Sequence, residues 1–291
     1  MLNYNKSINR VFTKKVINEL ISTGYNEVYD FVVKRFLVDT ESKTNGELIS
    51  EIYTHLGNSY RNEYYYTNTL LNKLLINIHS VTTTTALSQV RIANHIADFV
   101  MINGDGKVYE IKSDLDNFER LNDQLYDYFK AFSYVSVLAS EHELHHVEQV
   151  LNELGDMGNA VGIYVLSEKD TIFSKKKGRN PTRFNDNLDY HCLFNLLRKA
   201  EYTNLIKNYF GYVPDVAPAF YYTECLKLFC TLNILTAQKL TYIELKKRNK
   251  VTKQELDSIP LELKSVIYFS DCSKKAEEIN HFLKQPYKGG N

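Results

Sequence analysis

Two carboxylates and one ammonium group stand close together in IADFVMINGDGKVYEIKSD, residues 96–114, a segment that otherwise has the pattern of a β-hairpin. Asp98 lies in the first apolar run, and Glu110 and Lys112 lie two positions apart in the second. Because side chains alternate between the two faces of a strand, Glu110 and Lys112 share one face. Alternating Glu and Lys residues also cover ordinary solvent-exposed strand faces, so this spacing by itself favours a structural role.

The loop of the hairpin determines whether Asp98 joins the other two groups. The turn signal NGDG at residues 103–106 predicts a three-residue loop with a bulge, whose last glycine takes the left-handed conformation. That loop would place Asp98 across from Lys112 and diagonal to Glu110, whereas a two-residue loop would place Asp98 opposite Ile111. Two converging carboxylates repel each other unless a cation bridges them. Their oxygens suit Mg²⁺ or Mn²⁺, and the lysine can orient an attacking water and offset charge that develops on a phosphate.

Two flanking helices supply further polar side chains. Glu63 is in helical phase with the leucines that follow it, so we expect it to be buried, with a metal or Lys112 as its partner. Gln124 and Tyr128 lie one turn apart on the helix after the hairpin, beside its apolar stripe. Polar residues at the border of an apolar stripe are common, so each of these is informative only together with the others.

The periodicity of apolar residues predicts the elements that must position these groups. Helices are expected up to residue 58, with Gly24 and Gly57 as stops, and a further helix over 59–78. A strand over 82–93 and the two strands of the hairpin follow. The pattern then predicts a helix over 115–132, a strand over 134–139, a helix over 141–154 and a strand over 160–167. The crossover helix between the last two strands implies that they are parallel. The predicted organisation is an N-terminal helical segment (1–58), an α/β core (59–170) and a C-terminal helical region (171–291).

This order of elements, with Asp98 on one strand and Glu110-Ile111-Lys112 on the next, resembles the PD-(D/E)XK nuclease superfamily. The resemblance implies an αβββαβ restriction-endonuclease-like core with a mixed sheet, and a nuclease that hydrolyses phosphodiester bonds with Mg²⁺ or Mn²⁺. Glu63 and the spacing Gln124-x-x-x-Tyr128 resemble the subgroup typified by bacterial recombination exonucleases. Ala97 departs from the motif, because it stands where the motif has proline.

The resemblance also implies a role for each residue of the site. Asp98, Glu110 and the backbone carbonyl of Ile111 would bind the metal, with Glu63 nearby. Lys112 would act on the nucleophilic water. Gln124 and Tyr128 would help to hold the active site and the DNA.

Composition restricts the possible partners. The chain has 35 basic and 35 acidic residues, so no global field attracts nucleic acid or membrane, and no apolar run reaches the length of a membrane span. We therefore expect a cytoplasmic protein that binds nucleic acid, with DNA favoured, through a local basic surface; a protein partner or a homo-oligomer stays open. The basic loop SKKKGRNPTR is the first candidate for that surface, through Lys175, Lys176, Lys177, Arg179 and Arg183.

Two other functions compete with the nuclease. The sequence His142-Glu143-Leu144-His145-His146 matches HExxH, which on a helix would place two imidazoles one turn apart for zinc, with the glutamate as general base of a metalloprotease. Its charged neighbours favour solvated histidines on a surface helix instead. The other alternative is a nuclease-like fold that binds nucleic acid or protein without cutting it, because a fold alone does not establish an activity.

Overall fold

The computed structural model describes residues 2–59, 61–76, 81–113, 116–167, 172–173, 178–249, 251–270 and 276–289. The chain forms two compact units, each described by itself. The first unit combines residues 1–82 with 251–291, and the second comprises residues 83–250. This grouping differs from the predicted division into segments 1–58, 59–170 and 171–291. Residues 251–291 belong with the N-terminal helices, and residues 171–250 belong with the sheet.

In its described residues, the first unit is built from helices and the loops that connect them. Side-chain caps begin several of its helices, as Thr13, Asn26 and Asn62 do, and Gly24 ends the second helix at φ 75°, as predicted. The elements are α1 (Leu2–Val11), α2 (Lys14–Thr23), α3 (Glu27–Phe36), η1 (Thr40–Ser42), α4 (Asn45–Ser59), α5 (Glu63–Leu70), the π-helical η2 (Leu71–Ile76), α13 (Lys253–Asp257), η3 (Leu261–Leu263), α14 (Lys264–Tyr268) and α15 (Ala276–Lys284).

The predicted stop at Gly57 is wrong, because Gly57 lies inside α4. A Cβ atom at this position would lie 2.8 Å from the ring and hydroxyl of Tyr65. The glycine therefore permits the close approach of α5 to α4 and does not end the helix.

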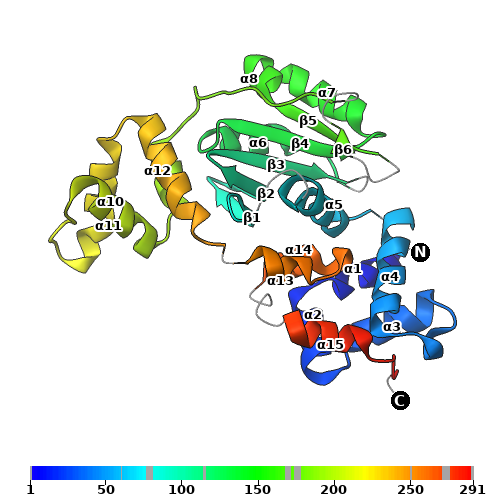
Figure 1. Ribbon diagram of the computed structural model, residues 1–291. Coiled ribbons are helices and arrows are strands. Elements are labelled where there is room, and N and C mark those ends of the chain that lie inside the picture. Colours follow the sequence, from blue (N-terminus) through cyan, green and yellow to red (C-terminus); the bar gives the residue numbers. More distant parts are fainter. Residues whose placement is uncertain are drawn as a thin grey trace. The chain divides into compact units, whose positions relative to one another are not determined.

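The second unit contains a six-stranded mixed sheet in the order β1-β2-β3-β4-β5-β6 (Figure 1). Its strands are β1 (Thr85–Ile92), β2 (His95–Asn103), β3 (Asp105–Lys112), β4 (Tyr134–Ser140), β5 (Gly162–Leu166) and β6 (Ile172–Phe173). β2 is antiparallel to both of its neighbours, β1 and β3, whereas β3, β4 and β5 are parallel neighbours. The α/β class, the order αβββαβ and the flanking helices are therefore confirmed.

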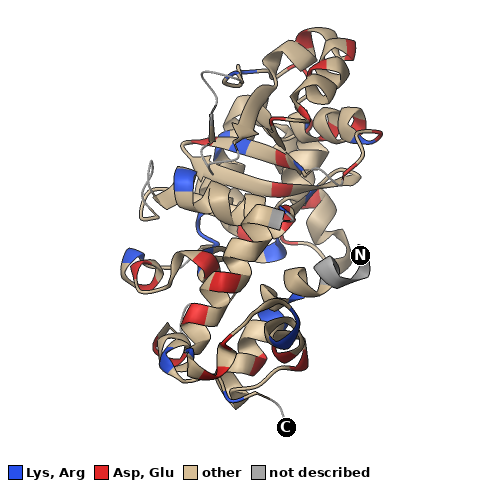
Figure 2. Ribbon diagram, turned by 90° about the vertical axis from the view of Figure 1, so that its right-hand side faces the viewer, with Lys and Arg blue, Asp and Glu red and all other residues tan. Residues whose placement is uncertain are grey.

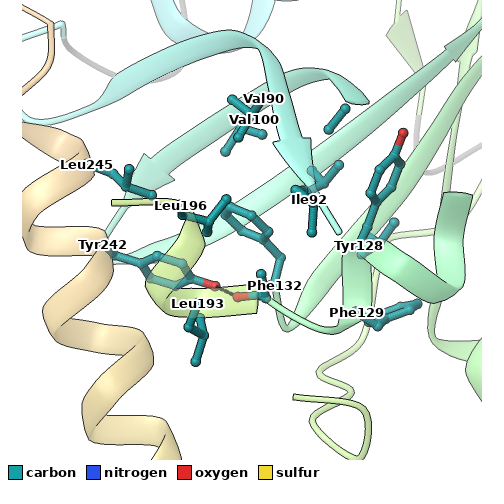
Figure 3. Close-up of a cluster of buried hydrophobic side chains, with 14 of the residues drawn as sticks. Val90, Ile92, Val100, Tyr128, Phe129, Phe132, Leu193, Leu196, Tyr242 and Leu245 are labelled. Carbon is teal, nitrogen blue, oxygen red and sulfur yellow. Dashed lines mark hydrogen bonds between the residues drawn. The ribbon is translucent and has the colours of Figure 1, made fainter. Parts of the chain in front are cut away.

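Helices α6 (Leu121–Phe129), α7 (Leu144–Glu153) and α8 (Gly155–Ala160) connect the parallel strands. α6 contacts β2 and β4, and it begins later than the capping residues at 113–116 predicted. Its apolar stripe, through Leu121, Leu125 and Phe129, enters the main hydrophobic cluster. Figure 3 shows Phe129 in this cluster. The other face of the sheet carries an aromatic row, in which Tyr109 makes edge contacts with Phe99 and Tyr164.

Four further helices belong to this unit: α9 (Tyr190–Asn195), α10 (Lys199–Phe210), α11 (Pro218–Cys230) and α12 (Ile234–Lys246). α12 reaches the sheet through Tyr242, which stacks on Phe132 with ring centroids 5.3 Å apart and donates a 2.8 Å hydrogen bond to the Ala131 carbonyl (Figure 3). Gly106 of β3 makes room for both rings, because a Cβ there would lie 2.7 Å from Tyr242 Cζ and 2.8 Å from Phe132 Cδ1.

We predict that Gly106→Ala lowers the free energy of unfolding by about 1–3 kcal/mol, because the added methyl group overpacks the Phe132–Tyr242 stack. Urea unfolding followed by far-ultraviolet circular dichroism measures the change. Gly104→Asn is the matched control in the same hairpin, since Gly104 has φ 76° and open space around its Cβ position, and asparagine tolerates that conformation. Equal stability of Gly106→Ala and the control would contradict this packing argument.

Candidate active site

The β2–β3 hairpin brings Asp98 and Glu110 to neighbouring positions. The register pairs Phe99 with Tyr109 and Asn103 with Asp105, so the next step along the two strands would place Asp98 opposite Glu110. In this register the loop between the paired residues has an odd number of residues. The sequence argument required such a loop for the two carboxylates to share a face. The predicted details of the loop are wrong: Gly104, at φ 76°, is the left-handed residue, and the register leads from Phe99 and Tyr109 to Asp98 and Glu110, not to Lys112.

Asp98 lies where β2 and β3 separate. Their paired residues end at Phe99 and Tyr109, whereas β3 continues beside β4 as far as Lys112. The half-buried Asp98 side chain bridges the separating strands, because its Oδ2 accepts a 2.8 Å hydrogen bond from the Ile111 backbone N–H. The aspartate is thereby held next to the residue between Glu110 and Lys112.

Glu110 and Lys112 form a buried ion pair on the face of β3 that α6 covers. Lys112 Nζ lies 3.2 Å from Glu110 Oε1. Lys112 is 6% exposed and Glu110 is 2% exposed. Lys112 also donates a 2.9 Å hydrogen bond to Gln124 Oε1. An ion pair this deeply buried is not the solvent-exposed Glu/Lys alternation that the spacing alone would favour.

Tyr128 completes this cluster from the next turn of α6. Its hydroxyl lies 2.6 Å from Glu110 Oε2 and 2.9 Å from the Ile96 carbonyl. The ring belongs to the hydrophobic cluster, while its hydroxyl points away from the apolar side chains (Figure 3). Burial, together with the nearby Glu110 carboxylate, raises the pKa of Tyr128, so the phenol stays protonated and its O–H donates a hydrogen bond to Glu110 Oε2.

The ionisation of Glu110 depends on these neighbours. Burial raises the pKa of Glu110, while the ammonium of Lys112 is the largest influence that lowers it, followed by the hydrogen bond from Tyr128. The structure thus brings together Glu110, Lys112, Gln124 and Tyr128, as the sequence predicted, and places Asp98 beside Ile111.

Glu63 differs from its prediction. It is the first residue of α5, and its side chain is exposed, whereas residues 65–70 of that helix are buried. Helical phase with Leu70 predicts burial only for the part of α5 that is packed against other residues. The helix begins at Glu63, ahead of that packed part, so the glutamate side chain is exposed. Glu63 belongs to the first unit and the other site residues to the second, so its role as a metal ligand stays a prediction.

The oxygen atoms around β3 can be compared with the needs of a divalent cation. Within the residues that the structure describes, no group of three or more His, Cys, Asp and Glu side chains could hold a metal ion. The set that the resemblance implies is smaller: the carboxylates of Asp98 and Glu110 and the carbonyl of Ile111. These are the hard oxygen ligands that Mg²⁺ and Mn²⁺ take, and each carboxylate oxygen offers more than one acceptor position.

The basic loop is described only in part. Lys175, Lys176 and Lys177 lie outside the described residues. Arg179 donates from its guanidinium to the carbonyls of Val161 and Gly158, at the junction of α8 and β5.

Arg183 lies over the ring of Tyr134 and 3.1 Å from Asp105. These two residues begin β4 and β3, so Arg183 is at the opposite end of β3 from Lys112. Basic and acidic residues are interspersed over the ribbon (Figure 2), in agreement with the balanced composition. Neither described arginine supports the expected nucleic-acid surface, and that surface stays a prediction.

The HExxH residues have a different geometry from a zinc-binding helix. α7 begins at Leu144, so His142 precedes the helix and is not one helical turn from His146. Glu143 lies 2.7 Å from His146 Nδ1 in a pair at the start of the helix. This arrangement matches the alternative of surface histidines.

One polar residue near the site was not predicted. Gln89 of β1 directs its Nε2 toward Asp98 Oδ1, at 3.5 Å. The sequence offered only a weak signal, because a polar residue near the middle of an edge strand is ordinary.

We predict that Lys112→Met raises the pKa of Glu110 further, because it removes the largest influence that lowers this pKa. A carboxyl group whose pKa is raised on folding loses stabilising effect as the pH rises from its unfolded value through its folded value. The free energy of unfolding of Lys112→Met should therefore fall relative to wild type as the pH rises above the ordinary glutamate value. Side-chain ¹³C NMR of labelled glutamate, in chelator, measures the pKa. Lys130→Met is the control, since Lys130 pairs with Asp127, and an unshifted Glu110 in Lys112→Met would contradict the assignment.

Comparison with known proteins gives one family. A model of the family described as "Bacteriophage P4 protein cII" matches residues 57–288, well over half of the chain. Neither the search of curated proteins nor the search of solved structures gave a significant match. The matched range contains the whole sheet, α6 and the Glu110–Lys112 site, and the chain belongs to the bacteriophage P4 protein cII family.

Proposed function

We propose that this protein is a metal-dependent nuclease that hydrolyses phosphodiester bonds, with DNA as the favoured substrate. The observation that carries the proposal is the buried Glu110–Lys112 pair on β3, joined by Gln124 and Tyr128 and with Asp98 beside it at the strand separation. The family name does not state an activity, so the proposal rests on this arrangement and on its resemblance to PD-(D/E)XK nucleases.

The burial of the cluster supports a functional use. A charged pair pays a desolvation cost that apolar residues of similar volume would not pay, so retaining Glu110 and Lys112 inside the sheet costs stability. Perturbed ionisable groups of this kind concentrate at functional sites. The pair also lies on a held stretch of β3, since this stretch pairs with β4 and both charged groups have hydrogen-bond partners on α6.

Asp98, Glu110 and the Ile111 carbonyl would hold Mg²⁺ or Mn²⁺. When bound, the metal would act as a Lewis acid on a phosphate oxygen and would lower the pKa of a bound water. Glu63 would join these ligands only if the N-terminal end of α5 reaches the site.

The protein's own side chains have separate tasks in the proposed reaction. Water attacks phosphorus, one P–O bond breaks, and the products are a phosphomonoester and an alcohol. The Lys112 ammonium orients the water and offsets negative charge that develops on the phosphate oxygens. Gln124 holds Lys112, and Tyr128 holds Glu110 in its ionised form, so both act through the residues that they contact.

A second candidate is a nuclease-like module that binds nucleic acid or protein without cutting it. One observation favours this candidate: both carboxylate oxygens of Glu110 already have protein partners, Lys112 at 3.2 Å and Tyr128 at 2.6 Å. Binding of DNA or RNA without cleavage in either Mg²⁺ or Mn²⁺ would identify such a module.

No helix in the described parts of the chain is long and apolar enough to cross a membrane. We propose the cytoplasm as the place of action, in keeping with the proposed nucleic-acid substrate.

We predict that Glu110→Gln abolishes cleavage and weakens Mn²⁺ binding together, because it removes a charged ligand while keeping the shape of the side chain. Lys112→Met should retain Mn²⁺ binding but lower the cleavage rate by on the order of 10²-fold or more, as loss of one charge-stabilising donor typically does. Calorimetric Mn²⁺ titration and cleavage of linear, circular and single-stranded DNA and of RNA measure both effects.

The surface pair Glu224–Lys227 provides the control, since Lys227→Met removes an exposed ammonium and should change neither quantity. Cleavage by Lys112→Met at the wild-type rate would remove Lys112 from the mechanism and overturn the motif assignment.

A further inference from the structure

Gln89 has an unusual backbone conformation within a strand. Its φ is 52°, in the left-handed region that residues other than glycine rarely adopt. The β1–β2 register pairs Ser88 with Phe99 and Val90 with Ala97, so Gln89 is the residue of β1 that stands opposite Asp98. Strain of this kind persists only where the surrounding structure enforces it, and it concentrates at functional sites.

The strain coincides with a break in the alternation of both strands. Val90 lies in the main hydrophobic cluster and Leu87 packs against it, although residues three apart on a regular strand face opposite sides. The alternation of faces is also broken in β2, where Ala97 and Val100 lie three residues apart and both belong to the cluster. Both irregularities enclose the Gln89–Asp98 position. They release Asp98 from the regular ladder, so that its Oδ2 can reach the Ile111 N–H of β3.

Gln89 contacts the other oxygen of the same carboxylate. Its Nε2 lies 3.5 Å from Asp98 Oδ1, a long and therefore weak hydrogen bond. The exposed Gln89 side chain approaches from β1, while Ile111 approaches from β3. The two donors therefore come from strands on opposite sides of Asp98 and contact different oxygens of its carboxylate.

We propose that Gln89 is a positioning residue for Asp98, and that its left-handed backbone is retained because it directs the carboxamide onto Oδ1. The effect of Gln89 on metal binding and cleavage rests on the proposed function, whereas its effect on the position of Asp98 does not. Ala93 offers a matched control, because it has φ 50° at the β1–β2 turn.

The experiment compares Gln89→Gly, Gln89→Glu and Ala93→Gly. Both glycine variants relieve the same left-handed strain and add similar freedom to the unfolded chain. Amide hydrogen exchange of Ile111, in metal-free protein, reports whether Asp98 still accepts its bond. We expect several-fold faster Ile111 exchange in Gln89→Gly, and in Gln89→Glu through carboxylate repulsion, with wild-type exchange in Ala93→Gly.

Mn²⁺ affinity and cleavage form the second readout. We expect both to fall in the two Gln89 variants and to stay at the wild-type level in Ala93→Gly. Ile111 exchange in Gln89→Gly that matches Ala93→Gly would overturn the positioning role. Faster Ile111 exchange in Gln89→Gly, with neither Mn²⁺ binding nor cleavage by wild type, would support the positioning role and refute the nuclease.

Discussion

The buried ion pair between Glu110 and Lys112 is the constraint on which the rest of the site depends. Both groups are almost inaccessible to water, and removing two charges from water is costly unless their geometry and hydrogen bonds compensate. Compensation comes from α6, through Gln124 on the ammonium and Tyr128 on the carboxylate. The ion pair therefore requires α6 to lie at one place along β3, and the apolar stripe of α6 in the main cluster holds it there.

The strand pairing of the sheet changes next to this ion pair. β3 exchanges an antiparallel neighbour for a parallel one, and β2 separates from β3 just beyond the pair of Phe99 and Tyr109. Asp98 occupies this separation and satisfies the Ile111 N–H that β2 no longer pairs. The Asp98 carboxylate thus has a structural role where the two strands separate, and it lies beside Ile111, the residue between Glu110 and Lys112. In the proposed function, the same carboxylate also serves as a metal ligand.

Much of the α/β unit follows from short-range patterns in the sequence. The hairpin, the crossover helix and the parallel strands have clear periodicities, and the spacing of Glu110, Lys112, Gln124 and Tyr128 fixes their faces before any packing is known. The loop conformation was not predictable, because Gly104 and Gly106 both suit a left-handed position, whereas Gly106 is needed for the close approach of Phe132 and Tyr242. The exposure of Glu63 depends on where α5 leaves its buried stretch, and the strain at Gln89 depends on three strands together. Such features arise from tertiary contacts that no local pattern encodes.

The central claim is that Asp98 and Glu110 share one divalent cation beside Lys112. Anomalous diffraction from crystals of the protein soaked in Mn²⁺ tests it most directly, because the metal is located without reference to activity. The account predicts one anomalous peak in contact with the Asp98 and Glu110 carboxylates and the Ile111 carbonyl. Saturating Mn²⁺ with no peak at these oxygens, and with both oxygens of Glu110 still held by Lys112 and Tyr128, would contradict it.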